Sequence, residues 1–138
     1  MDMNSAYRPY FFRAIAAMLL LMAVSSCKGA GDKAMTPESI RGGETRETMS
    51  PLYFTGSVRD AYQIAKEIPE VLDGLHCYCE CKKNFGHKSL LTCYVDEHAK
   101  HCDLCLNQAF MASELHRQGM DAVSIRKAVD KRFSNQSH

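Results

Sequence analysis

Six cysteines lie within a 29-residue stretch of this chain, between Cys77 and Cys105, and they are its main candidates for chemistry. Three alternate at the start of the stretch, a single cysteine follows after eleven residues, and a Cys-x-x-Cys pair ends it. Thiolate sulfur selects Cu(I) and Zn²⁺ and also holds iron–sulfur clusters. The sequence therefore predicts a soft-metal site whose candidate ligands are Cys77, Cys79, Cys81, Cys93, Cys102 and Cys105.

The spacing of these cysteines sets conditions on such a site. In an extended chain the sulfurs of Cys77, Cys79 and Cys81 would share one face but lie roughly 6–7 Å apart, from a rise of about 3.3 Å per residue. Because metal–sulfur bonds are only about 2.3 Å long, these three sulfurs can bind one ion only if the chain turns. Cys102 and Cys105 stand at the expected start of a helix, where free N–H groups favour thiolate.

Two other interpretations of the six sulfurs stay open. Three structural disulfides would suit an exported chain, and no metal would then be bound. The resulting module could be a docking surface for another protein, such as a membrane partner. Alternatively, Cys102-x-x-Cys105 could exchange thiols and disulfides, although no βαβ pattern of a thioredoxin-like fold surrounds it. We favour the metal site, because bridges within Cys-x-Cys-x-Cys would be strained.

Three histidines are candidate extra ligands because imidazole suits both zinc and copper. His76 and His101 are next to cysteines, and His87 lies between Cys81 and Cys93. We expect His98 on a packed helix face instead. No catalytic constellation is evident: the chain has no glycine-rich phosphate loop, no HExxH and no placeable serine–histidine–acid set. The sequence therefore predicts a binding protein and not an enzyme.

The elements that would position these residues are helical. Apolar residues at helical spacing predict a helix that begins after Ser57, a short turn that begins at Pro69 and ends at Gly74, and a helix over residues 88–100. Two further helices are expected, over residues 103–117 and from Asp121 to Phe133. The fold class is therefore mainly α, a small helical domain over residues 57–138 with a cysteine-rich central loop.

The N-terminal region predicts export and lipid anchoring. Residues 1–26 have two arginines and then an eleven-residue apolar stretch, which is shorter than the roughly 20 residues of a transmembrane helix. The stretch ends in Val24-Ser25-Ser26-Cys27, which resembles the lipobox of bacterial lipoproteins. We therefore expect Cys27 to be lipidated and to hold the protein to the bacterial cell membrane, on its periplasmic or outer side. Residues 27–56 are polar and aperiodic, which predicts a flexible linker.

Charge argues against nucleic acid as a partner. The chain has 17 basic and 16 acidic residues, and removing Arg8, Arg13 and Asp2 with the signal peptide leaves 15 of each. A neutral mature chain without a basic run lacks the charge that binding to phosphates requires.

The cysteine pattern also resembles a known family. His76-Cys77-Tyr78-Cys79-Glu80-Cys81 is similar to the hexapeptide of the PCYCGC-motif family of small, largely uncharacterised bacterial lipoproteins, and the resemblance covers roughly residues 59–133. His76 replaces the proline of that motif and Glu80 replaces its glycine. The resemblance implies a lipoprotein with a single domain, and it implies no established reaction.

Overall fold

The computed structural model describes residues 34–136, and one compact unit begins at Met35. The predicted signal peptide and Cys27 lie outside the described residues. The unit contains five α-helices within that described range: α2 (Gly56–Glu67), α3 (Pro69–Asp73), α4 (Cys81–Phe85), α5 (Asp103–Arg117) and α6 (Ala122–Phe133). Short 3₁₀ helices cover Pro51–Tyr53, Leu91–Tyr94, Glu97–His101 and Ser134–Gln136. No strand occurs in residues 34–136, so the predicted mainly α fold class is confirmed.

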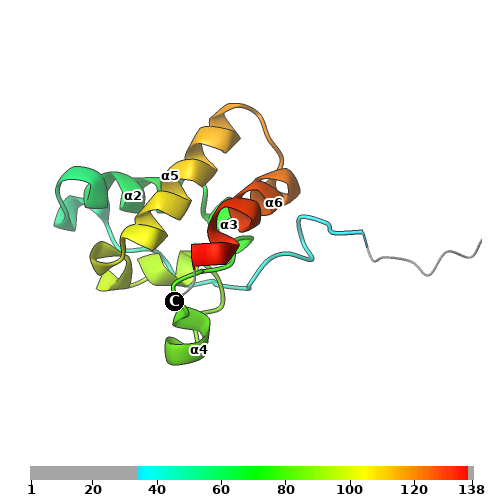
Figure 1. The fold of residues 1–138 in the computed structure, drawn as a ribbon. Helices are drawn as coiled ribbons and strands as arrows, with labels where there is room; N and C mark the ends of the chain where they lie inside the picture. The colour runs from blue at the N-terminus through cyan, green and yellow to red at the C-terminus, as the bar shows by residue number, and fades with distance from the viewer. Residues whose placement is uncertain (1–33, 137–138) are drawn as a thin grey trace, which may run out of the picture. The chain divides into compact units, whose positions relative to one another are not determined.

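The helix α5 is central to the domain and packs against both α2 and α6 (Figure 1). Both helices of the α2–α5 contact have small buried residues, Ala61 and Ala65 on α2 and Ala109 and Ala112 on α5. On α6 the buried stripe is Ile125, Val129 and Phe133. By contrast, the short helix α4 lies apart from these long helices in Figure 1.

Local signals in the sequence explain where most helices begin and end. The carboxylate of Asp121 accepts hydrogen bonds from the N–H groups of Val123 and Ser124, which caps α6 as predicted. Pro69 begins α3, and Gly74 is its C-cap. The N-cap of α2 is Thr55, whereas the sequence predicted Ser57.

The predicted single helix over residues 88–100 is wrong. Two 3₁₀ helices replace it, and the chain is extended between them at Asp96, with φ −133° and ψ −166°. The Asp96 carboxylate accepts a hydrogen bond from the N–H of His98 at 2.8 Å. An aspartate that bonds to nearby backbone in this way competes with the helical hydrogen-bond ladder, which is why the apolar spacing did not give one helix.

Residues 42–49 are held against the domain and do not form the free linker expected from their polar composition. The N–H of Gly42 donates to the carbonyl of Asp73 at 2.8 Å, and the N–H of Met49 donates to the carbonyl of Tyr94 at 2.9 Å. The Glu44 side chain is buried. The compact unit therefore starts earlier than the sequence indicated, at Met35 and not at residue 57.

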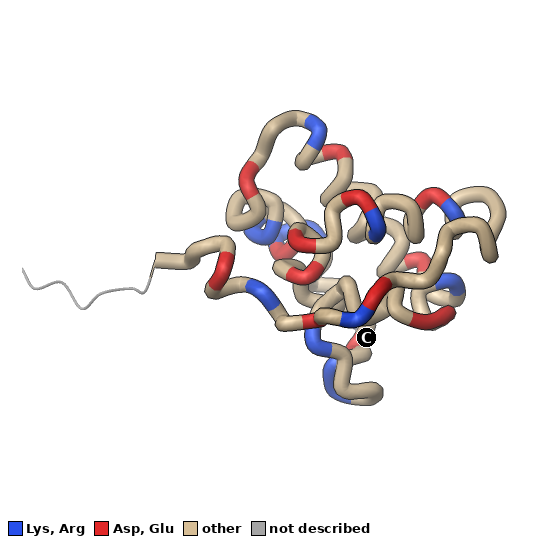
Figure 2. Tube along the Cα trace, turned by 180° about the vertical axis from the view of Figure 1, so that it is seen from behind, with Lys and Arg blue, Asp and Glu red and all other residues tan. Residues whose placement is uncertain are grey.

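The outer surface shows no concentration of basic residues. In Figure 2 lysines and arginines are interspersed with aspartates and glutamates along the described chain. None of the helices within residues 34–136 is long and apolar enough to cross a membrane.

Candidate metal centre

The structure brings the six cysteines together: five of their sulfurs lie within 3.7 Å of a neighbouring sulfur, and Cys102 interacts with Cys79 and Cys105. The Sγ atom of Cys77 lies 3.0 Å from that of Cys79, 3.3 Å from that of Cys93 and 3.7 Å from that of Cys105. Cys79 in turn lies 2.8 Å from Cys81 and 3.4 Å from Cys105, sulfur to sulfur. A disulfide bond is about 2.05 Å long. All six cysteines, Cys102 included, are free thiols.

The turn that the sequence geometry required is present, and two helices hold it. Gln108 of α5 is fully buried, and its side-chain amide donates to the carbonyl of His76 at 2.8 Å while its oxygen accepts from the N–H of Tyr78 at 3.4 Å. The Tyr78 hydroxyl donates to Asp130 of α6 at 2.7 Å. These bonds fix the backbone on both sides of Cys77, so its sulfur points into the cluster.

Glu80 takes the conformation that makes the sulfurs of the loop converge. Its φ is +62° and its ψ is 11°, in the left-handed region, and it is the only residue other than glycine with a positive φ among the described residues. This position corresponds to the glycine of the PCYCGC hexapeptide. A left-handed residue costs roughly 1–2 kcal/mol when it has a Cβ, and glycine avoids that cost. The backbone of the loop thus needs a left-handed residue here, whether or not the residue is glycine.

Sulfur and nitrogen atoms in the cluster form three groups, each compact enough to hold one ion. The first group is all sulfur, and the others mix sulfur with imidazole nitrogen; within each group the ligand atoms lie within 4.8 Å of one another. The groups are Cys77, Cys79, Cys93 and Cys105; Cys79, Cys81 and His98; and Cys81, His87 and Cys93. In a tetrahedral zinc site with bonds near 2.3 Å, sulfurs lie about 3.8 Å apart, which the first group approaches.

The structure places His87 and His98 at the cluster, whereas the sequence predicted His76, His87 and His101 as candidate ligands. The Nδ1 atom of His87 lies 3.2 Å from the sulfur of Cys93, in agreement with its candidacy. His98, which we expected on a packed helix face, places its Nε2 atom 2.9 Å from the sulfur of Cys81. His76 packs its ring against Tyr78 instead, and His101 is exposed. Neither of these two belongs to a donor group.

Hydrogen bonds among the thiols favour the ionisation of Cys77 and Cys79. Hydrogen bonds from Cys105, Cys79 and Cys93 lower the pKa of Cys77 far below its usual value. Hydrogen bonding from Cys102, with a further contribution from Cys105, lowers the pKa of Cys79 to about 2. Burial is the leading cause of a lowered pKa at His87, which keeps its imidazole neutral and able to bind a metal.

Cys81 and Cys105 keep their protons more firmly. Burial is the largest cause of the raised pKa of Cys81, followed by its hydrogen bond with Cys79. The pKa of Cys105 is also raised, first by hydrogen bonds with Cys102 and Cys77. Because a metal ligand must be thiolate, an ion entering the cluster would displace protons from these residues.

A second polar region lies next to the cluster, built around two buried carboxylates, and we call it the polar clasp: Arg41, Glu44, Arg46, Asp73, Ser89 and Thr92. The Asp73 carboxylate accepts from Arg41 Nε at 3.0 Å, from the N–H groups of Gly43 and Glu44 and from the Ser89 hydroxyl. Thr92 donates its hydroxyl to Glu44 at 2.9 Å. The clasp therefore ties the N-terminal segment to the residues immediately before Cys93. The sequence offered no signal for it.

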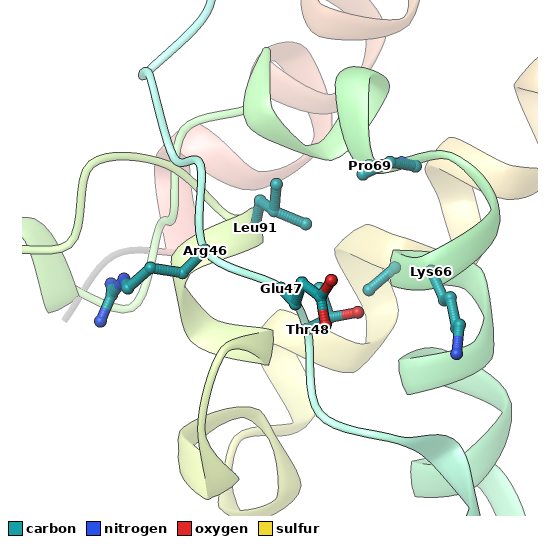
Figure 3. Close-up of a pocket in the computed structure, with 7 residues that line it drawn as sticks. Arg46, Glu47, Thr48, Lys66, Pro69 and Leu91 are labelled. Atoms are coloured by element: carbon teal, nitrogen blue, oxygen red, sulfur yellow. The ribbon is translucent and has the colours of Figure 1, made fainter.

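The surface of the described domain also has hollows that no cysteine lines. One pocket of about 290 Å³ is lined by Arg46, Glu47, Thr48, Ala65, Lys66, Pro69 and Leu91, between the N-terminal segment and the end of α2 (Figure 3). It contains no cysteine or histidine. The chemistry of this domain is thus concentrated in a buried cluster and not in an open cleft.

Comparison with protein families decides the relationship of the chain. The model of a family described as proteins of unknown function with a PCYCGC motif matches residues 17–137. The chain belongs to this family. No curated protein and no solved structure gives a significant match. The family description names no activity, so what can be said of function rests on the cluster itself, which is compatible with a bound metal ion.

Proposed function

We propose that this PCYCGC-family protein is a bacterial envelope lipoprotein whose helical domain binds a soft metal ion through cysteine thiolates. The ion would be Cu(I) or Zn²⁺, and the role would be sequestration or trafficking and not catalysis. One observation carries the proposal: six free thiols gather in one place, and five of their sulfurs lie within 3.7 Å of a neighbouring sulfur without a disulfide. Such a set of soft donors matches the preference of these ions.

The way the domain is stabilised favours an exchangeable ion over a purely structural one. Large buried side chains such as Tyr62, Leu72 and Ile125 make up most of the hydrophobic core, to which the four buried cluster cysteines also belong. The Tyr62 ring stacks on Phe54 at 4.0 Å and meets Tyr94 edge-on at 5.0 Å. A domain with this core should stay folded when the metal leaves, unlike small zinc domains that unfold without their ion.

Access to the cluster also supports exchange. Cys77, Cys81, Cys93 and Cys105 are buried, whereas Cys79 and Cys102 are half-buried. A ligand exchange reaction begins when an incoming thiolate or ion reaches an exposed donor. Cys79, which belongs to two of the three donor groups, is the accessible member through which an ion would enter or leave.

The test is to purify the full chain in detergent, under reducing and oxygen-free conditions, and measure bound metal and free thiols. Stoichiometric copper or zinc with six reactive thiols in the domain, after removal of the ion, would support the proposal. Protein that takes up neither ion and has three disulfides when isolated from its own compartment would contradict it. Selective redox cycling of Cys102 and Cys105 would favour the oxidoreductase interpretation.

Anchoring at Cys27 needs its own measurement. We expect Cys27→Ser to move the protein from the membrane fraction to the aqueous fraction, because the lipid would be lost. The control is Cys102→Ser, which leaves Cys27 in place and should stay with the membrane. Retention of the Cys27→Ser protein in the membrane fraction would contradict lipid anchoring.

A further inference from the structure

Three donor groups in the cluster share sulfurs in pairs. Cys79 belongs to the first and second groups, Cys81 to the second and third, and Cys93 to the first and third. A thiolate has several lone pairs and can bridge two soft ions. The sharing therefore fits ions placed side by side better than independent sites.

One ion cannot account for all the donors. A tetrahedral ion takes four ligands, and the four sulfurs of Cys77, Cys79, Cys93 and Cys105 would complete it. Three donors then remain: Cys81, His87 and His98. The Cys81 sulfur contacts His98 Nε2 at 2.9 Å, and the two imidazole rings lie 4.8 Å apart, centre to centre.

The surroundings of the two imidazoles resemble a built site. His87 is buried, with 7% of its surface exposed, and its Nδ1 atom faces a sulfur. Phe85 of α4 covers both rings from outside, with its centre 4.9 Å from that of His98 and 6.0 Å from that of His87. Phe85 itself is 65% exposed, less than Leu52 and Tyr53, and what distinguishes it is its ring contact with both imidazoles.

From this arrangement we infer that the centre is dinuclear and thiolate-bridged, an inference that rests on the proposed metal binding. The first ion is held by sulfur alone, and the second by Cys81, His87 and His98 together with a sulfur shared from Cys79 or Cys93. Both ions are of the same soft class, since thiolate and imidazole each suit Cu(I) and Zn²⁺.

Two bound cations would also neutralise the negative charge of the buried thiolates. Four of its cysteines are buried, and no lysine or arginine within residues 34–136 makes a hydrogen bond to a cluster sulfur. Buried thiolates without countercharge are costly. A second ion allows Cys81 to ionise without adding an unpaired charge.

The experiment is a Zn²⁺ titration of the reduced, metal-free full chain in detergent, with ions per chain measured by elemental analysis and native mass spectrometry. We expect about two ions for the wild-type chain. Cys81→Ser and His98→Gln should each reduce this twofold, to one ion, while His101→Gln keeps two. His101 is the matched control because it is in the same 3₁₀ helix as His98 but outside every donor group. Circular dichroism verifies the fold of each variant, and His98→Gln decides if Cys81→Ser unfolds.

A second readout distinguishes the two ions. Co²⁺ in place of Zn²⁺ should show two kinds of site in the wild type, one with sulfur ligands only and one with nitrogen as well, and His98→Gln should lose the second spectrum. One ion per wild-type chain, unchanged in both variants, would overturn the dinuclear centre and leave the proposed metal binding intact. Two ions in every variant would also overturn it. A reduced wild type that binds neither Zn²⁺ nor, in the same titration, Cu(I) would defeat the proposed function itself.

Discussion

The polar clasp and the sulfur cluster are neighbouring buried regions, and they differ in how their polar atoms are satisfied. In the clasp, carboxylates meet N–H and hydroxyl donors and two arginines: Arg41 pairs with Asp73, and Arg46 pairs with Glu44. No buried side-chain nitrogen or oxygen among the described residues lacks a hydrogen bond. In the cluster, the soft donors contact mainly one another. The clasp is complete within the chain and should act on stability, whereas the cluster should respond to an added ion.

The largest effect should come from breaking the clasp at Asp73, whose side chain is fully buried and accepts four hydrogen bonds. We expect Asp73→Ala to reduce the free energy of unfolding by about 3–5 kcal/mol, because it leaves the buried N–H of Glu44 and the buried hydroxyl of Ser89 without an acceptor, at about 1–3 kcal/mol each. Urea unfolding of the reduced, metal-free chain measures this. Asp121→Ala, which removes an exposed helix cap, should cost only about 1 kcal/mol. If the two variants lost equal free energy of unfolding, the clasp would contribute no more to stability than an exposed helix cap.

For the cluster, we expect a large effect on stability in the presence of metal and a small effect in its absence. Adding Zn²⁺ at a hundred times its Kd should raise the stability of the wild type by about 2.7 kcal/mol. Cys77→Ala should lose most of this gain, because Cys77 contacts three of the other sulfurs, yet change the metal-free stability by only about 1 kcal/mol. Thermal unfolding with and without Zn²⁺ tests it, with Asp121→Ala as the control that keeps the gain. If Zn²⁺ stabilised Cys77→Ala as much as the wild type, Cys77 would not be a metal ligand.

A smaller effect is expected from acid. The Arg46 side chain is the main cause of the lowered pKa of Glu44, and hydrogen bonds from Glu44 N–H and Arg41 lower that of Asp73 although burial opposes them. A group whose pKa is lower in the folded state contributes stability above its unfolded pKa, and that contribution is lost as pH falls. The metal-free protein should therefore lose stability below about pH 4.5, as both carboxylates take up protons.

Glu44→Gln is the variant that isolates this acid response. It should be less stable than the wild type at pH 7 and lose less on going to pH 3. The Tm measured across that range gives the comparison, with Glu67→Gln on the exposed face of α2 as a control that keeps the wild-type slope. A Glu44→Gln slope as steep as the wild type would exclude Glu44 as a source of the acid response.

The smallest effect should come from the cysteine loop. Glu80→Gly should stabilise the metal-free protein by about 0.5–1 kcal/mol, since glycine relieves the left-handed strain but has more entropy to lose on folding. Gly86→Ala is the reverse control: Gly86 has a φ of +70°, so alanine there should destabilise by about 1 kcal/mol. Equilibrium unfolding measures both. A destabilised Glu80→Gly would mean that the glutamate side chain contributes more than its backbone strain costs.

The sequence predicted what local spacing controls. Helical periodicity identified the regions of α2, α5 and α6, and the capping residues Asp121 and Pro69 were read correctly. The cysteine count and spacing predicted a common site, and the sulfurs of five of the six cysteines meet there. Residue type alone was informative because thiols have few uses other than disulfides, metals and redox chemistry.

Long-range contacts explain what the sequence did not predict. Glu44 meets Thr92 across 48 residues, and nothing in the aperiodic segment around Glu44 indicates that partner. His98 was assigned to a packed face because it falls at helical spacing with apolar residues such as Tyr94, but its side chain contacts Cys81, seventeen residues earlier. The helix α4 was missed because it begins only after the left-handed turn at Glu80.

Gln108 has a consequence for how this family should be recognised. Its amide both donates and accepts, so glutamate would lose the donor to His76 and leucine would lose both bonds. It follows Cys102 and Cys105 at intervals of three, which places sulfur and amide on the same stretch of α5. In this chain the hexapeptide is held by a second motif, Cys-x-x-Cys-x-x-Gln. Members that keep the hexapeptide should keep Cys-x-x-Cys-x-x-Gln as well, and a substitution at the glutamine should appear together with a change in the loop.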